Sequence, residues 1–178
     1  MIPELWDKCI EFHGHACGGL ASGYRAAEIA SEILGFKFGR TEDEDIVCVA
    51  ENDACGVDCI QCLLSCTVGK GNMILRPRGK NAYSFFDRNT GRSVRLVLRP
   101  IDRDSMTKEE VIDFILNAPV EQVFDVKDVG FRLPERARIF GNRVCECCGE
   151  TAREDMVRFQ DGKVVCIDCF RGYDRGWM

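Results

Sequence analysis

The chain has 178 residues, of which 46% are hydrophobic and 30% are charged, and its formal net charge is −5. These values describe a globular chain that is long enough for one core and a small additional module. They exclude a membrane-spanning protein, because no apolar run approaches the roughly 18 residues that such a span needs.

Twelve cysteines occur in the chain, and the N-terminus lacks the pattern of a secretion signal. Clustered cysteines without such a signal indicate a reducing compartment, where they bind metal or do redox chemistry more often than they form disulfides. We therefore expect a cytoplasmic protein, and one typical of an anaerobe, in which many free thiols are less hazardous.

Taken in chain order, the apolar periodicity predicts an α+β core domain, with helices packed on a mainly antiparallel sheet, over residues 1–138. The predicted core elements are a helix at 18–34, a strand at 46–50, a helix at 55–67, strands at 73–76, 83–86 and 94–99, and a helix from 108 to about 119. Gly35 is placed to end the first helix, and Thr107 has capping-box spacing before the last one. Residues 130–143 have the composition of a linker, and a small zinc-finger domain is predicted over residues 139–178.

Charge is distributed unevenly along these elements. Residues 1–69 carry 4 Lys and Arg against 12 Asp and Glu, whereas residues 70–103 carry 9 against 2. Residues 139–178 carry 6 against 7, so the tail lacks the positive face that nucleic-acid-binding proteins usually show. We therefore expect no nucleic-acid partner. We interpret the basic middle as solvated strand faces whose arginines pair with the acidic flanks.

Both histidines of the chain lie within one short segment, Phe12-His13-Gly14-His15-Ala16-Cys17-Gly18-Gly19. If this segment is extended, His13, His15 and Cys17 point to one side, because side chains alternate along an extended chain. Imidazole and thiolate together suit zinc or another borderline-soft metal. Cys17 also precedes the first predicted helix, whose positive end favours a thiolate. An ordinary glycine turn is the alternative, but we favour a functional site.

A second cysteine-rich segment contains Cys55, Cys59, Cys62 and Cys66 at steps of four, three and four residues, which is one face of a helix. Free cysteine also packs as a small apolar residue, and we favour this interpretation for Cys59 and Cys62. Cys55 differs, because it begins the predicted helix near Asp58, where ligands from a neighbouring loop can converge.

The strongest pattern is in the tail, where two Cys-x2-Cys pairs are separated by a short polar stretch. Four thiolates at this spacing can surround one tetrahedral zinc ion; they are Cys145, Cys148, Cys166 and Cys169. A segment this short buries too little apolar surface to fold alone, so the metal would supply its folding energy. Two disulfides are the less favoured alternative. Cys147 lies inside the first pair and could compete as a ligand.

Three segments resemble the FmdE family of formylmethanofuran dehydrogenase proteins: FHGHACGGLASGYRAAEIASEILG, ENDACGVDCIQCLLSCTVGKGNMIL and GKNAYSFFDRNTGRSVRL. The tail, CECCGETAREDMVRFQDGKVVCIDC, resembles the treble-clef zinc finger that some members append. This resemblance implies an α+β core, an intertwined homodimer and a metal or ligand site. The implied site residues are His13, His15, Cys17, Cys55 and Asp58. Positions 59 and 62, which are cysteines here, tend to be apolar in the family.

Together these patterns predict a metal-binding protein with a structural zinc in the tail and a second zinc or other transition metal in the core. An open coordination position in the core site would let it polarise a ligand or activate water, with Cys17 and Asp58 as the candidate catalytic residues. The alternative is an accessory module that senses metal or redox state and docks a molybdenum or tungsten oxidoreductase or another protein. A third hypothesis is thiol redox chemistry along the helix of Cys55 to Cys66.

Overall fold

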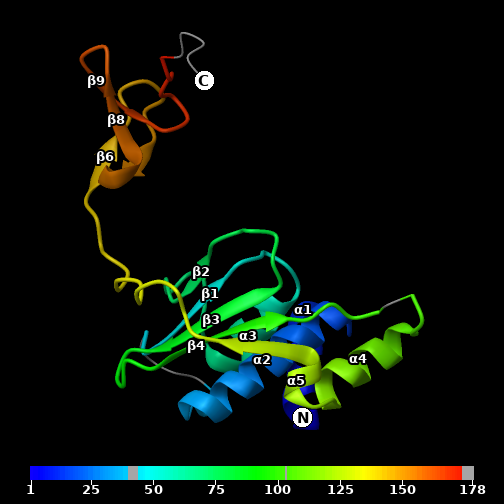
Figure 1. Cartoon of the computed structure of the whole chain (residues 1–178). Helices are drawn as coiled ribbons and strands as arrows, with labels where there is room; N and C mark the ends of the chain where they lie inside the picture. The colour runs from blue at the N-terminus through cyan, green and yellow to red at the C-terminus, as the bar shows by residue number, and fades with distance from the viewer. Residues whose placement is uncertain (40–43, 103, 174–178) are drawn as a thin grey trace. The chain divides into compact units, whose positions relative to one another are not determined.

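The computed structural model describes residues 1–39, 44–102 and 104–173. Within it the chain divides into two compact units, Met1–Ala137 and Arg138–Met178 (Figure 1). We call the first the core unit and the second the finger unit, and each is described by itself.

The described part of the core unit is built on a five-stranded sheet of order β2-β1-β3-β4-β5. The strands are β1 (Ile46–Ala50), β2 (Met73–Leu75), β3 (Ala82–Asp87), β4 (Ser93–Leu98) and β5 (Phe124–Lys127). Among them β1 and β2 pair in parallel, with Cys48 opposite Met73, whereas the other neighbours pair antiparallel. The predicted α+β class with a mainly antiparallel sheet is confirmed, and β5 is an edge strand that the sequence analysis missed.

Helices cover one face of this sheet (Figure 1). They are α1 (Pro3–His13), α2 (Gly18–Leu34), α3 (Gly56–Leu64), α4 (Lys108–Asn117) and the short α5 (Val120–Val123). Strand β1 shows how the two faces differ, because Cys48 joins the large core under the helices while Val47 and Val49 pack with residues 129–133 on the other face. None of the described helices is long and apolar enough to cross a membrane.

Helices α2 and α3 approach each other backbone to backbone. A Cβ atom added at Gly23 would lie 2.1 Å from the carbonyl oxygen of Gly56, and one added at Gly56 would lie 2.2 Å from the hydroxyl of Tyr83. Only glycine fits such a contact, because any side chain would overlap the neighbouring backbone. This close approach brings the N-termini of the two helices together, and Cys17 and Cys55 stand at those N-termini as capping residues.

Several predicted elements are confirmed in detail. The helix predicted at 18–34 has those bounds and ends at Gly35 in the left-handed region, with φ of 83°. Thr107 caps α4 through a complete capping box with Glu110. Two expectations are wrong. Residues 3–13 form α1, which the sequence analysis did not predict, and the helix predicted at 55–67 is the shorter α3.

The finger unit contains two antiparallel hairpins. Its described elements are β6 (Asn142–Val144), β7 (Thr151–Arg153), the 3-10 turn η1 (Glu154–Met156), β8 (Val157–Gln160) and β9 (Lys163–Cys166). Its small apolar cluster is formed by Cys145, Val165 and Cys166, so sulfur makes up much of what this unit buries.

Candidate metal centres

The first candidate centre lies where α1 ends and α2 begins. His13, His15 and Cys17 each offer one ligand atom, and these atoms lie within 4.8 Å of one another. Sγ of Cys17 is 4.0 Å from Nε2 of His13, and the two imidazole centroids are 4.7 Å apart. Ligand atoms around a tetrahedral zinc are roughly 3.3–3.8 Å apart, given its bond lengths, so a small contraction would suit the ion. The residues present therefore fit a metal.

The route by which these side chains meet differs from the predicted one. His13 is the last residue of α1, and Gly14 then turns the chain with φ of 97°. The segment is therefore not extended throughout, and the predicted alternation of His13, His15 and Cys17 is wrong for His13. The three side chains converge because a glycine in the left-handed region joins a helix end to a short link.

Asp58 stands behind His13. Its Oδ2 is 2.7 Å from Nδ1 of His13, and it projects from the first turn of α3. A carboxylate on Nδ1 keeps the proton on that nitrogen and leaves the lone pair of Nε2 free for a metal, which is the usual arrangement behind a histidine ligand. The structure thus places Asp58 beside the ligand group as an orienting residue.

Cys55 stands beside Cys17. The backbone N–H of Leu20 donates to Sγ of Cys17 at 3.3 Å, an interaction that stabilises negative charge on that sulfur. Burial, followed by the hydrogen bond with Cys17, raises the pKa of the Cys55 thiol. Of the two sulfurs, Cys17 is therefore the thiolate and Cys55 the neutral thiol that donates to it. Among the described residues Cys55 is outside the convergent group of ligand atoms.

A cavity of about 340 Å³ opens beside His15 and Cys17. It is also lined by the first turn of α4 and the residue before its cap, with Met106, Thr107 and Lys108 contributing. The sequence analysis identified Thr107 as a helix cap only and gave no signal that it would face the histidine segment. That proximity depends on the packing of α4 against α2, which no local pattern encodes.

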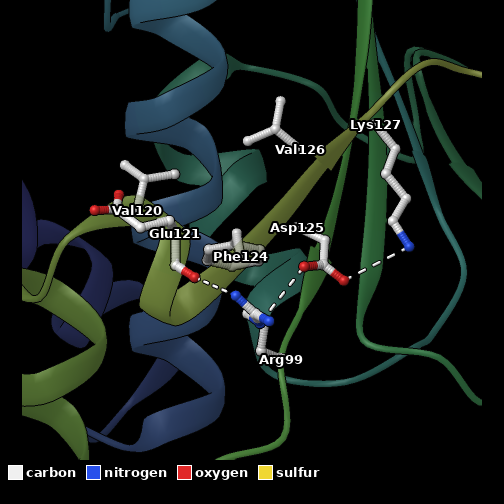
Figure 2. A pocket seen from close by; sticks show the side chains of 7 residues that line it. All are labelled: Arg99, Val120, Glu121, Phe124, Asp125, Val126 and Lys127. Carbon is white, nitrogen blue, oxygen red and sulfur yellow. Dashed lines mark hydrogen bonds and ion pairs between the residues drawn. The ribbon is translucent and has the colours of Figure 1, made fainter.

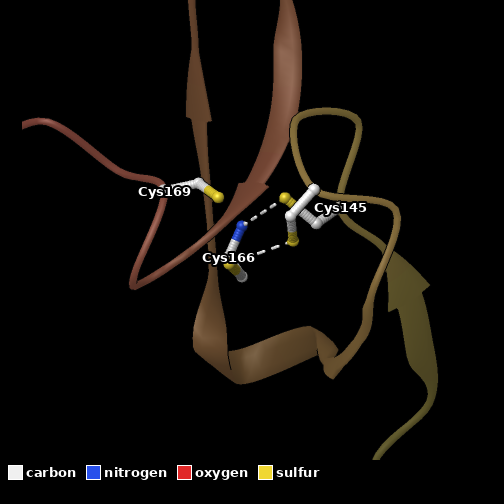
Figure 3. Close-up of side chains that lie close together, drawn as sticks. Cys145, Cys166 and Cys169 are labelled. Carbon is white, nitrogen blue, oxygen red and sulfur yellow. Dashed lines mark hydrogen bonds between the residues drawn. The ribbon is translucent and has the colours of Figure 1, made fainter.

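The second candidate centre is in the finger unit. Sγ atoms of Cys145, Cys148, Cys166 and Cys169 all lie within 4.8 Å of one another. Figure 3 shows Cys145, Cys166 and Cys169 turned toward one another from the two knuckles, and Sγ of Cys148 is 3.9 Å from Sγ of Cys166. Backbone hydrogen bonds from Cys148 and then from Cys166 lower the pKa of the Cys145 thiol to about 6. The arrangement favours thiolate and matches a closed tetrahedral zinc site.

The alternatives considered for the tail differ from this arrangement. All twelve cysteines are free in the structure, so the two Cys-x2-Cys pairs form no disulfide. Cys147 is exposed and lies outside the group of four convergent sulfurs. Gly149 turns the chain after the first pair with φ of 78°.

Two further cavities lack histidine and cysteine among their described lining residues. One lies beside β5, where Arg99 and Lys127 both pair with Asp125, at 3.5 and 3.6 Å (Figure 2). The other, of about 500 Å³, lies near Glu51, which Arg95 holds through Nε at 2.6 Å and Nη2 at 3.0 Å.

The expected pairing of the basic middle with acidic flanks therefore holds for Arg95 and Arg99. It does not describe every cation there. Arg76 lies over the ring of Phe131, with its guanidinium carbon 5.2 Å from the centroid.

The fold and the two clusters define a class of protein, a metal-binding α+β protein with an appended four-cysteine zinc finger. Residues 12–125 match the family described as FmdE, Molybdenum formylmethanofuran dehydrogenase operon, and the chain belongs to this family. Residues 138–175 match the prokaryotic dksA/traR C4-type zinc finger. The resemblance inferred from the sequence motifs is confirmed, and the finger unit is a zinc-finger segment of this type.

Two individual proteins are similar to this chain. A protein of Archaeoglobus fulgidus described as a probable S-adenosyl-L-methionine-binding protein is 30% identical, over 97% of this chain and 54% of the relative. The chain thus spans about half the length of that relative. An FmdE-like protein of tungsten formylmethanofuran dehydrogenase from Syntrophus aciditrophicus superposes with a TM-score of 0.60 at 23% identity, covering 94% of this chain and 90% of that one. This likeness establishes the fold.

Proposed function

We propose that the core unit binds a transition metal, zinc in the first instance, through His13, His15 and Cys17. The observation that carries this proposal is the convergence of two imidazoles and a thiol with a carboxylate 2.7 Å from Nδ1 of His13. Two imidazoles and one thiolate suit zinc, copper, iron or nickel, and three protein ligands are typical of a catalytic rather than a structural zinc. The finger unit holds a second, structural zinc in this proposal.

The residues around the core centre support binding of a small polar ligand there. A zinc ion with three protein ligands leaves a coordination position for water or a ligand atom. Thr107 and Lys108 line the adjacent cavity and add a hydroxyl and an ammonium group to one wall. Asp58 fixes the tautomer of His13, and the Cys55 thiol donates toward Cys17, so both positioning groups hold the donors in a single arrangement.

Elemental analysis of protein purified without oxygen tests this proposal directly. We expect two metals per chain in the parent protein and one in His13→Ala or Cys17→Ser, because each variant removes a core ligand and leaves the finger intact. Cys66→Ser is the matched control, since its thiol is buried elsewhere and donates to the carbonyl of Ile46 at 3.4 Å. Full core-metal content in both ligand variants would falsify the assignment.

The identity of the small ligand can be approached on the same samples. S-adenosyl-L-methionine belongs in the first screen, because a relative of this chain is described as probably binding it. A thermal-shift response that appears in the parent protein and disappears in Cys17→Ser would place the ligand at the core centre. A response retained in Cys17→Ser would separate ligand binding from the metal.

The proposal also includes the assembly and location that the family resemblance implies, an intertwined homodimer in the cytoplasm of an anaerobe. Light scattering of the purified protein tests the dimer, and a monomer at micromolar concentration would contradict it.

A second candidate function is an accessory role, in which the finger unit docks a molybdenum or tungsten oxidoreductase. Its apolar side chains support this role, because Phe159 is 75% exposed and Val144 is 60% exposed. Such side chains commonly mark protein interfaces, and the near-neutral tail favours a protein partner over nucleic acid. Recovery of an oxidoreductase with the tagged protein, lost in Phe159→Ala, would support it. Recovery of the protein alone would favour the independent metal-binding role.

A further inference from the structure

A cluster of three thiols lies at the contact between α1 and α3, outside both metal centres. Cys9 comes from α1, and Cys59 and Cys62 come from α3. Cys9 and Cys59 are fully buried, whereas Cys62 is half-buried. The thiol of Cys9 is in hydrogen-bonding reach of both Cys59 and Cys62. The sequence analysis considered the two cysteines of α3 but gave no role to Cys9.

The register of the two helices explains this cluster. Cys9 precedes His13 by four residues on α1, and Cys62 follows Asp58 by four residues on α3. Residues four apart lie on the same face of a helix, one turn away from each other. Because His13 and Asp58 are in contact at 2.7 Å, the next turn along both helices brings the cysteines together.

The environment of the three thiols distinguishes them from cysteines that only fill space. The thiol of Cys59, and to a lesser degree that of Cys62, donates toward Cys9 and lowers the pKa of Cys9 despite its burial. Burial raises the pKa of Cys62 to about 11, although nearby Lys8 opposes the rise. Cys62 is therefore the reachable thiol, which reacts slowly at neutral pH, and Cys9 is the one best stabilised as a thiolate.

We propose that Cys9 and Cys62 form a reversible dithiol–disulfide site, with Cys59 holding Cys9 in position and a small-molecule disulfide as the oxidant. The thiolate of Cys62 attacks one sulfur of that disulfide, whose S–S bond breaks and releases one thiolate. The thiolate of Cys9 then attacks Sγ of Cys62 and displaces the second external thiolate. One protein S–S bond forms, and two electrons and two protons pass to the oxidant, which leaves as two thiols.

This site is independent of the proposed metal function, because neither Cys9 nor Cys62 belongs to a group of convergent metal ligands in the described residues. The reverse reaction, with an external dithiol as reductant, returns the two protein thiols and needs no metal. The ligation proposal and the disulfide proposal can therefore fail separately.

Peptide mapping across a redox titration tests the proposal. The metal-loaded protein is equilibrated anaerobically in buffers of oxidised and reduced dithiothreitol, its free thiols are alkylated, and linked peptides are identified by mass spectrometry. We expect a Cys9–Cys62 linkage in oxidising buffer that disappears in reducing buffer and is absent in Cys62→Ser. Cys66→Ser is the matched control, since Cys66 closes the same cysteine series but contacts the carbonyl of Ile46, and it should keep the linkage.

Three outcomes would overturn the proposal. Full alkylation of Cys9 and Cys62 in oxidising buffer would show that no disulfide forms there. A linkage between Cys9 and Cys59 would show that Cys62 is not the partner thiol. A Cys9–Cys62 linkage that persists in strongly reducing buffer would show that the bond is not reversible. Mapping of the parent protein alone decides all three, so the test does not depend on the folding of a variant.

Discussion

The two units of this chain use metal ligands in opposite ways. The core unit buries large side chains such as Tyr24, Tyr83 and Phe85 between its helices and sheet, and its His and Cys donors lie at the margin of that core. The described apolar cluster of the finger unit consists of Cys145, Val165 and Cys166, two of which are zinc-ligand candidates. A unit whose core is made of ligands needs its metal to fold, whereas a unit with an apolar core can hold a metal without depending on it.

The largest effect that this contrast predicts is the unfolding of the finger unit when its zinc site is broken. Cys166→Ser removes a buried ligand, and structural zinc binding contributes about 10 kcal/mol or more to such folds. We expect amide signals of residues 139–173 to collapse to unfolded positions in NMR spectra while those of the core unit stay in place. Cys147→Ser is the control, because Cys147 is exposed and outside the sulfur group. A folded finger in the metal-free Cys166→Ser protein would break the comparison.

The next effect concerns packing in the core unit. Gly23→Ala places a Cβ atom 2.1 Å from the carbonyl oxygen of Gly56, so α2 and α3 must separate. We expect a loss of about 3 kcal/mol or more in the free energy of unfolding, since overpacking typically costs roughly 1–3 kcal/mol even where side chains can adjust. Chemical denaturation of the core transition measures it. Gly130→Ala is the matched control, because a Cβ at Gly130 meets no atom within 4 Å.

These two predictions also show what the sequence could and could not reveal. The zinc ligands of the finger unit were predictable because all four lie in two local pairs whose spacing alone defines the site. The core centre was only partly predictable. His13, His15 and Cys17 share a segment, but α1, the left-handed turn at Gly14 and the contact with Asp58 depend on helix packing.

The thiol cluster was the least predictable feature. Cys9 is an isolated cysteine in the sequence and acquires its neighbours only through the pairing of α1 with α3. The strand β5 was missed for a related reason, because its four residues include two charged side chains and it is specified by pairing with β4.

A third, smaller effect is expected at the ion pair of Glu51 and Arg95. Their side chains are 11% and 18% exposed, and the hydrogen bonds from Arg95 lower the pKa of Glu51. A carboxylate with a lowered folded-state pKa stabilises the protein above its unfolded pKa of about 4.3, and this contribution is lost as the pH falls through the folded value. We expect Glu51→Gln to cost about 2 kcal/mol at pH 7.

The pH dependence separates this ion pair from a general loss of packing. In acid titrations followed by circular dichroism, the stability difference between the parent and Glu51→Gln should shrink as the pH falls below about 4. Glu11→Gln, which changes an exposed carboxylate on α1, should follow the parent curve. A difference between parent and Glu51→Gln that is constant at all pH values would contradict the electrostatic account.

The smallest effect on stability, and the sharpest test of the comparison, is expected from Asp58→Asn. Asp58 is partly exposed and contacts His13 at 2.7 Å, so the variant should keep the core fold within about 0.5 kcal/mol. Removing the carboxylate behind a histidine ligand typically weakens metal binding about 10- to 100-fold. Competition with a chromophoric chelator measures this change, and Asp53→Asn, at an exposed neighbouring carboxylate, should leave the affinity unchanged. Complete loss of core metal would instead make Asp58 a direct ligand. Unfolding of the core unit would mean that its metal, like that of the finger unit, is needed for folding.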